Sequence, residues 1–283
     1  MNIARVNRAV TVDEALSRHS LLAGTSDSPL LDCQIILSHA LDVDRSWLYA
    51  HGDESLSKAA QTVFDTLLEK RLNGVPVAYL VGHKAFWDME LNVSAATLIP
   101  RPETELLVEI TLEKFGPEKR TVIDAGTGSG AIAIALSRER PAWQVYGTDI
   151  SVAGLAVAGT NRTRLAANIH LVRASWLSCF GPGSFDAIVC NPPYIGAGDR
   201  HLDALQHEPT GALVADDNGL ADITRVIAQA STQLRSGGWL VMEHGFDQGV
   251  VTRDLAHRAG LIDIHTHVDA AGQPRALVAR RQP

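Results

Sequence analysis

The sequence predicts an α/β fold in which a mainly parallel sheet is covered by helices on both faces, with a small helical bundle in front of it. Beyond Arg120, short apolar segments typical of strands alternate with helical segments, which is the pattern of an open parallel sheet. Residues 1–75 instead repeat apolar side chains at helical spacing, as the buried faces of helices do. Between these parts, residues 76–102 lose the helical period, which indicates an extended linker.

The N-terminal part contains several helix start and stop signals. Thr11–Glu14 has the form of a capping box. Pro29 suits the first position of a second helix, whose apolar residues recur as far as Leu41. A further helix is expected from about Ser57 to Leu72, where Asn73-Gly74 supplies a left-handed stop. We therefore expect an N-terminal helical domain over residues 1–75.

The linker region, residues 76–102, has two features of extended chain. Phe86–Val93 alternates large apolar and polar residues, as a strand or a hairpin does. Ile99–Pro102 contains two prolines, and the residue before a proline is pushed out of the helical region. We expect a hairpin linker here and a catalytic domain over residues 103–283.

Seven strands are predicted in the C-terminal part. They span Thr121–Ala125, Trp143–Asp149, Ile169–Ala174, Phe185–Cys190, Trp239–Glu243, Leu261–Thr266 and Ala276–Ala279. In a parallel sheet the carboxyl ends of such strands form the ligand crevice, so the residues that follow them are the candidates for function.

Composition limits the function classes. The chain has 283 residues, 46% of them hydrophobic, and a formal net charge of −7. Proteins whose main partner is nucleic acid usually carry a basic surplus, so nucleic acid is an unlikely partner, although a local basic groove stays possible. No apolar run approaches the roughly 18–20 residues of a membrane helix. Met1–Arg5 lacks the pattern of a secretory signal, and we expect a cytoplasmic protein.

The cysteines and histidines show no metal pattern. Cys33, Cys179 and Cys190 form no CxxC pair, which argues against a disulfide framework and a structural zinc site. We expect all three to be reduced core residues. The eleven histidines show no spacing such as HExxH, and no metal is expected.

The first predicted strand runs into a glycine loop, Gly126-Thr127-Gly128-Ser129-Gly130, and then into a helix. Glycines there permit a tight turn and let backbone N–H groups approach a ligand. The loop is typical of sites for a nucleoside-containing cofactor, and it fits a methyl donor as well as a dinucleotide.

Two further residues follow strand ends. Asp149 comes about twenty residues after the loop and is placed to accept hydrogen bonds from ribose hydroxyls, whereas its alternative role is to cap the helix that starts near Ser151. Trp176 follows the third strand, where an indole can flank an adenine or can simply belong to the core.

The motif that decides the chemistry is Asn191-Pro192-Pro193-Tyr194, directly after the fourth strand. Its prolines restrict the backbone, so the Asn191 side-chain oxygen and the Pro192 carbonyl would be held as a fixed acceptor pair. A conjugated NH2 group is a poor nucleophile, as the ~18–20 kcal/mol amide rotation barrier indicates. Two acceptors that take both N–H bonds would turn its lone pair toward a methyl donor. Tyr194 would cover the flat substrate and exclude water.

Alternatives remain for this motif and for the whole chain. Asn-Pro-Pro is also typical of a rigid turn, although its combination with the glycine loop and Asp149 favours a catalytic role. The chain could otherwise be a nicotinamide-dependent dehydrogenase or a non-catalytic nucleotide-binding module. A dehydrogenase should have a proton-transferring Tyr-Lys or His pair at the crevice, and none is placed there.

Most of the chain resembles the HemK/PrmC family, the glutamine methyltransferases of class I peptide chain release factors. The segments that carry the resemblance are Pro76–Gly82, Phe86-Trp87, Leu98–Glu105, the glycine loop, Asn191–Tyr194, Glu208-Pro209, Leu213–Ala215 and Glu243–Gly245. Leu98–Glu105 together with Asn191–Tyr194 is more specific than either alone.

The resemblance implies a Rossmann-like class I methyltransferase sheet. It also implies methyl transfer from S-adenosylmethionine to the side-chain amide nitrogen, N5, of the Gln in the release factor Gly-Gly-Gln motif. It assigns the methyl donor to Gly126–Gly130, Asp149, Trp176 and Asn191, and the glutamine to Asn191–Tyr194, with Asn191, Pro192 and Tyr194 catalytic. The helical domain and the hairpin linker would help to dock the release factor.

Some positions are left open by the resemblance. Ser175 stands where the family usually has Asp, which affects the expected contact to the adenine amino group. Arg101, Glu103 and Glu105 are singled out by the resemblance alone, and an exposed linker salt bridge is their alternative role. Alternative substrates are a ribosomal protein glutamine and a nucleic-acid amine, adenine N6 or guanine N2.

Overall fold

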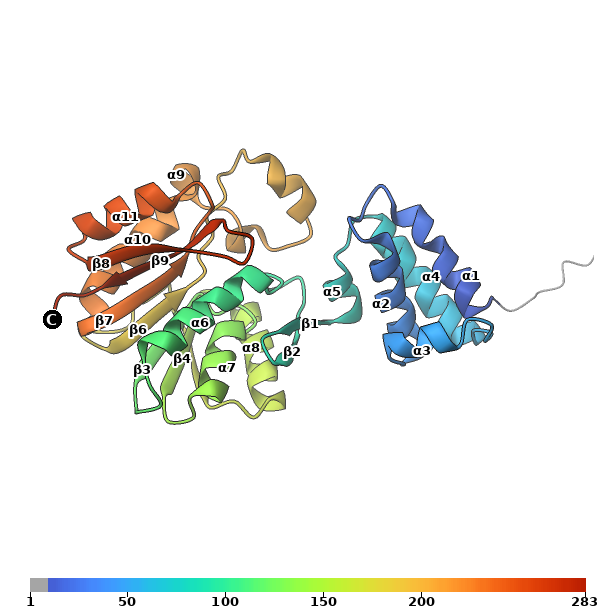
Figure 1. The fold of residues 1–283 in the computed structure, drawn as a ribbon, viewed down its shortest axis with the longest axis horizontal. Coiled ribbons are helices and arrows are strands. Elements are labelled where there is room, and N and C mark those ends of the chain that lie inside the picture. The colour runs from blue at the N-terminus through green and yellow to red at the C-terminus, as the bar shows by residue number, and fades with distance from the viewer. Residues whose placement is uncertain (1–9) are drawn as a thin grey trace, which may run out of the picture. The chain divides into compact units, whose positions relative to one another are not determined.

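The computed structural model describes residues 10–283, which divide between Gly82 and His83 into two compact units (Figure 1). The prediction that Met1–Arg5 is no secretory signal lies outside the described residues. Within residues 10–283, no helix is both long enough and apolar enough to cross a membrane.

The N-terminal unit is helical, as predicted. Its elements are α1 (Val12–Leu16), the 3-10 helix η1 (Ser17–Leu22), α2 (Pro29–Leu41), α3 (Arg45–Ala50), α4 (Lys58–Leu72) and α5 (Val77–Val81). The capping box at Thr11 is formed, and Ser57 caps α4 by accepting from the Ala60 N–H. Phe64 and Leu68 of α4 are fully buried in the core of the unit.

Helix α5 occupies the start of the segment that was expected to be extended. Pro76 precedes its first residue, and Gly82 ends it at φ +80°, a left-handed conformation that glycine adopts without strain. Val77 and Leu80 pack against the core of the N-terminal unit. The helix has only five residues, so its apolar side chains do not repeat often enough to show a helical period in the sequence.

The predicted hairpin is present at the start of the second unit. Strands β1 (His83–Phe86) and β2 (Met89–Asn92) pair antiparallel. The buried side chain of Asn161 fixes this hairpin, because it accepts a hydrogen bond from the Asn92 N–H at 2.7 Å and donates to the Asn92 carbonyl at 2.9 Å. The same amide also donates to the Ser129 carbonyl at 2.9 Å. The hairpin is thus tied to the glycine loop.

The second unit contains a seven-stranded sheet in the order β5-β4-β3-β6-β7-β9-β8, as Figure 1 shows. The strands are β3 (Thr121–Ala125), β4 (Gln144–Asp149), β5 (Ile169–Arg173), β6 (Phe185–Cys190), β7 (Leu234–Glu243), β8 (Ile262–Val268) and β9 (Pro274–Arg280). Strands β3 to β7 are parallel, and β9 runs antiparallel between β7 and β8. All seven predicted strands are confirmed, and only β7 begins much earlier than expected.

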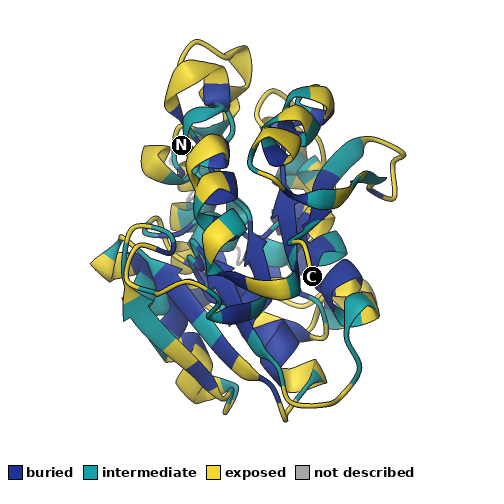
Figure 2. Ribbon diagram, turned by 90° about the vertical axis from the view of Figure 1, so that its left-hand side faces the viewer, coloured by how far each residue is buried: buried dark blue, intermediate teal, exposed yellow. Residues whose placement is uncertain are grey.

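Helices cover both faces of the sheet. The longer ones are α6 (Glu105–Lys114), α7 (Ala131–Glu139), α8 (Val152–Arg164), α10 (Ala221–Gln233) and α11 (Gly249–Arg258), and the shorter ones are η2 (Pro102–Thr104), η3 (Arg200–Leu205), η4 (Thr210–Ala212) and α9 (Asp216–Gly219). Helices α6 and α7 share one apolar core with the sheet, and α10 and α11 share the other. In Figure 2 the strands are accordingly buried, and the helices have exposed outer sides.

The cysteine prediction is partly wrong. Cys33 and Cys190 are buried, but Cys179 is exposed, and all three are free thiols. Cys179 lies in the turn between β5 and β6, in which Leu177 and not Cys179 is the fully buried residue.

Candidate active site

A cavity of about 430 Å³ lies at the carboxyl ends of the parallel strands, within the size range of small-ligand sites. Its wall contains most of the residues predicted from the sequence, namely Gly126, Thr127, Gly128, Ser129, Asp149, Trp176, Asn191 and Pro193. Gly130, Pro192 and Tyr194 are not part of this wall. Gly130 is instead the N-cap of α7, and Pro192 is buried.

The glycine loop packs directly against an aromatic ring. Gly126 has φ +81°, and a Cβ atom there would lie 2.8 Å from the Trp176 ring, so a side chain cannot be accommodated. The N–H groups of Gly126 and Thr127 both donate to the Thr148 carbonyl at 2.8 Å. The loop is therefore held by the end of β4 on one side and by an indole on the other.

Asp149 connects the glycine loop to the start of α8. One carboxylate oxygen accepts from the Gly128 N–H at 2.9 Å, and the other accepts from the Ser151 N–H at 2.8 Å. The N-cap of α8 is Ser151, whose hydroxyl accepts from the Gly154 N–H at 3.0 Å. Capping of α8 is thus performed mainly by Ser151, and Asp149 keeps lone pairs toward the cavity that it lines.

Trp176 lies at the cavity wall and also packs against the core shared with α10 and α11. Its indole N–H donates to Asp222 at 3.1 Å, and Arg225 pairs with the same carboxylate oxygen at 2.9 Å. The residue has φ +54°, which is uncommon for a bulky side chain. The indole is therefore held in one orientation by α10.

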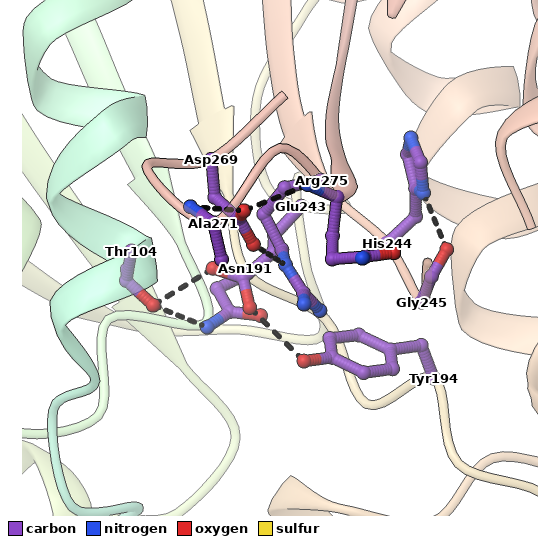
Figure 3. Close-up of polar contacts among 10 residues, drawn as sticks. Thr104, Asn191, Tyr194, Glu243, His244, Gly245, Asp269, Ala271 and Arg275 are labelled. Atoms are coloured by element: carbon purple, nitrogen blue, oxygen red, sulfur yellow. Dashed lines mark hydrogen bonds and ion pairs between the residues drawn. The ribbon is translucent and has the colours of Figure 1, made fainter. Parts of the chain in front are cut away.

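Asn191 is held by a chain of hydrogen bonds behind the cavity (Figure 3). Its Nδ2 donates to Thr104 Oγ1 at 3.1 Å, and Thr104 Oγ1 donates to Glu243 Oε2 at 2.7 Å. The Tyr194 hydroxyl donates to the other oxygen, Glu243 Oε1, at 3.0 Å. Both ends of the tetrapeptide are thus connected to one carboxylate.

Glu243 is buried, with 1% of its surface exposed. Burial raises its pKa above the usual range, while the hydrogen bonds from Thr104 and Tyr194 and the positive charge of Arg275 oppose the rise. Burial and the Glu243 charge also raise the pKa of the Tyr194 hydroxyl well above its usual value, so Tyr194 stays protonated. Arg275 itself pairs with Asp269 at 3.2 Å.

Comparison with known proteins identifies the family. Residues 15–82 match the PrmC N-terminal domain, and residues 102–212 match the methyltransferase small domain. The release factor glutamine methyltransferase of Xylella fastidiosa (strain Temecula1 / ATCC 700964) is 45% identical over 265 residues, which cover 92% of this chain and 96% of that protein. This chain belongs to the release factor glutamine methyltransferase family.

Two further likenesses agree with this assignment. The release factor glutamine methyltransferase of Escherichia coli (strain K12) is 40% identical over 258 residues, covering 90% of this chain and 93% of that protein. A methyltransferase structure from Pyrococcus furiosus matches with a TM-score of 0.55 and 16% identity, covering 77% of this chain and 100% of that chain. The Pyrococcus furiosus structure shows the fold alone, and this fold is the class I methyltransferase fold. Membership of a methyltransferase family implies S-adenosylmethionine as methyl donor.

Three residues of this family member were missed as site residues. In the sequence, Thr104 and Glu243 stand out only as parts of the segments that carry the resemblance, and Asp124 only as part of the predicted strand Thr121–Ala125. Asp124 is 1% exposed and lines the cavity. Its Oδ2 accepts from the Thr127 hydroxyl at 2.6 Å, whereas its Oδ1 has no partner. Burial raises the pKa of Asp124 to about 7. An acidic residue inside an apolar strand was the available signal.

The structure also places the residues that only the resemblance had singled out. Arg101 lines the cavity and pairs with Glu208, which is 6% exposed and also accepts from the Ile99 N–H at 3.0 Å. The Arg101 bridge is therefore not an exposed one. Glu105 accepts from the Trp87 N–H at 2.8 Å and so holds the hairpin turn. Glu103 is exposed.

Proposed function

We propose that this chain transfers a methyl group from S-adenosylmethionine to the side-chain amide nitrogen, N5, of the glutamine in the Gly-Gly-Gln motif of class I peptide chain release factors. The names of its relatives support this substrate, at 45% and 40% identity over nearly the whole chain. The observation that carries the chemistry is the orientation of Asn191. Its Nδ2 is used by Thr104, which leaves its Oδ1 as an acceptor at the cavity that Asn191 lines.

The residues of the cavity fit a cationic methyl donor. Asp124 has a buried carboxylate oxygen without a partner, and Asp149 keeps free lone pairs beside the glycine loop. The cavity wall is more apolar than polar, which suits a nucleoside that lies along the Trp176 indole. In this proposal Gly126–Gly130, Asp149, Trp176 and Asn191 hold the donor, with Asp124 in addition. S-adenosylmethionine supplies an electrophilic methyl group on a sulfonium.

The acceptor pair performs the positioning of the amide. The Asn191 Oδ1 and the Pro192 carbonyl would take the two N–H bonds of the glutamine, so its lone pair would face the donor. The same two oxygens would stabilise the positive charge that develops on nitrogen. Pro193 keeps the backbone rigid, and Tyr194, anchored on Glu243, would shield the flat amide from water. The methyl group would pass to nitrogen as the sulfonium leaves as a neutral thioether, and the N-protonated N-methyl amide would then lose its proton to water.

We further propose that the helical domain, residues 1–75, and the linker, residues 76–102, help to dock the release factor. Exposed apolar side chains in the helical unit, such as Leu30 and Tyr49, are compatible with a protein partner. Because release factors act on ribosomes, the proposed substrate also favours a cytoplasmic location.

Transfer of labelled methyl groups tests the function. A purified release factor should become labelled, and its Gln→Glu copy in the Gly-Gly-Gln motif should not. Purified ribosomal protein and duplex DNA test the two alternative substrates in parallel. Label on DNA alone, or on ribosomal protein alone, would overturn the substrate assignment. Thermal stabilisation by S-adenosylhomocysteine but not by NAD would support the donor assignment.

A further inference from the structure

The sheet register brings two distant residues to one place. Strands β6 and β7 are parallel, and Cys190 of β6 is paired with Met242 of β7. Asn191, which directly follows β6, and Glu243, the last residue of β7, therefore lie at the same level of the sheet edge. Thr104, the last residue of η2, inserts its hydroxyl between their side chains (Figure 3).

We infer that Glu243 is a positioning residue for the methyl transfer. It acts through the Thr104 hydroxyl to fix the Asn191 amide with its oxygen toward the substrate, and through the Tyr194 hydroxyl to fix the other end of the tetrapeptide. The inference rests on the proposed function, because the substrate amide is the group that Asn191 would hold. Glu243 itself touches no substrate in this scheme.

The direction of the hydrogen bonds carries the inference. A hydroxyl has one proton, and Thr104 contacts two partners, Glu243 Oε2 at 2.7 Å and an Asn191 amide group at 3.1 Å. An ionised carboxylate can only accept, so the Thr104 proton must go to Glu243. Thr104 then has only lone pairs for Asn191, and the group that faces it must be the NH2. The Asn191 oxygen is left as the acceptor at the cavity.

The opposite amide orientation requires a different proton arrangement. Thr104 could donate to the Asn191 oxygen only if Glu243 Oε2 carried a proton to donate in return. Asn191 would then present its NH2 group, a donor, to a substrate NH2 that needs acceptors. The ionised state of Glu243 is thus the productive one. The charged groups around it are Arg275 on β9 and Glu103 on η2, besides the Tyr194 hydroxyl.

A purely structural role of this buried cluster makes different predictions from a positioning role. If the cluster only ties η2 to the sheet, removing the Thr104 hydroxyl should lower the free energy of unfolding and leave kcat per folded molecule unchanged. If it orients Asn191, the loss should fall on kcat, since the amide orientation matters most when charge develops on the substrate nitrogen. Binding of the methyl donor should change little.

The test compares Thr104→Val with Thr104→Ser. Valine has the shape of threonine without the hydroxyl, and serine keeps the hydroxyl. We expect Thr104→Val to lower kcat on a release factor by roughly 10- to 100-fold, because small misplacement of a positioning group has effects of this size. Thr104→Ser should retain most of the activity. The dissociation constant of S-adenosylhomocysteine, measured by calorimetry, should stay within about twofold in both variants.

Thr111→Val is the matched control. Thr111 is also fully buried and lies on the following helix, α6, but its hydroxyl bonds only to the Leu107 carbonyl at 2.7 Å. The same chemical change there should affect stability and leave kcat of the folded protein unchanged. Equal losses of kcat in Thr104→Val and Thr111→Val would overturn the inference.

A double-mutant cycle then connects Glu243 to Thr104. It is made in a Tyr194→Phe background, which removes the second branch of the network. If Glu243 acts through Thr104, Glu243→Gln should lower kcat when Thr104 is present and should add little once Thr104 is valine. Multiplicative losses would contradict the inference. A wild-type protein that labels no release factor would instead disprove the proposed function, and the two failures are therefore distinguishable.

Discussion

Gly128 donates its backbone N–H to the Asp149 carboxylate at 2.9 Å, which joins the glycine loop to the end of the neighbouring strand. The relationship means that Asp149 shapes the loop in addition to offering lone pairs to a ligand. Removing the carboxylate should therefore affect donor binding in two ways at once.

We expect Asp149→Ala to weaken binding of S-adenosylhomocysteine by roughly 10- to 100-fold, because charged hydrogen bonds are typically worth about 1.5–3 kcal/mol. Calorimetric titration measures this. Ser151→Ala is the control, since Ser151 lines the same cavity but its hydroxyl caps α8, so its removal should cost about 1 kcal/mol of folding stability with little change in ligand affinity. Similar losses of S-adenosylhomocysteine affinity in both variants would indicate that Asp149 contributes to binding only by holding the start of α8.

Asn191→Ala should lower kcat by about 10²–10³-fold, the usual cost of one fixed group that stabilises charge in a transition state. The residue is half-buried at the surface of the cavity, so the thermal unfolding temperature should change little. Steady-state kinetics with a release factor measure kcat, and a calorimetric scan measures the unfolding temperature. Full turnover by the alanine variant would rule out the acceptor pair.

Asp124 should make folding stability depend on pH in the ligand-free protein. Its pKa is raised from 3.8 to about 7 by burial, so the stability it contributes is complete below 3.8 and is lost as pH rises through 7. Asp124→Asn cannot ionise, so its gain in stability relative to wild type should be larger at pH 9 than at pH 5, where the wild-type protein has lost only part of this contribution. Each pKa unit corresponds to about 1.4 kcal/mol, so the gain is at most a few kcal/mol.

Urea unfolding at the two pH values measures this difference. The same substitution should weaken binding of the cationic methyl donor, because it removes a negative charge from the cavity wall. A stability difference that does not change between pH 5 and pH 9 would show that Asp124 is not the titrating group.

Glu243 should produce an acid limb in the pH profile of kcat. Burial raises its pKa, so protonation occurs at higher pH than for an exposed glutamate. Activity is expected above that pKa and is lost as pH falls through it, since protonation permits the unproductive orientation of Asn191. Rates at saturating methyl donor and release factor test this. Glu243→Gln should be slower and should lack the limb, and an unchanged limb would assign it to another group.

The sequence was sufficient for the sheet because each strand is a compact apolar segment with its own boundaries. Strand β7 was predicted to start at Trp239, whereas it starts at Leu234. Gly237-Gly238 interrupts the strand pattern in the sequence, so the residues before it were not assigned to the strand. Helix α5 was missed because a helix of one turn has no measurable period. These errors are local, and they do not change the order of the elements.

The site was predictable where its residues form contiguous segments or lie at or just after the end of a predicted strand, as Asp149 and Trp176 do. The glycine loop and Asn191–Tyr194 are such segments, and the cavity wall includes most of them. The contact between Thr104 and Glu243 joins residues 139 positions apart, and it depends on strand order, which no local pattern encodes. Asp124 could not be predicted as a site residue because its importance comes from a buried oxygen, Oδ1, that has no hydrogen-bond partner, which is a property of the folded chain.

The side-chain amide of Asn161 donates hydrogen bonds both to the hairpin, at the Asn92 carbonyl, and to the glycine loop, at the Ser129 carbonyl. A release factor that bound to the hairpin would also affect the conformation of the glycine loop through Asn161. The release factor and the methyl donor should therefore influence each other's affinity. By thermodynamic reciprocity, a release factor that tightens donor-analogue binding must itself bind more tightly in its presence. Calorimetry of S-adenosylhomocysteine with and without release factor would reveal such mutual dependence, and Asn161→Ala should abolish it. If the wild-type protein bound S-adenosylhomocysteine with the same affinity in both cases, the Asn161 amide would have a structural role only.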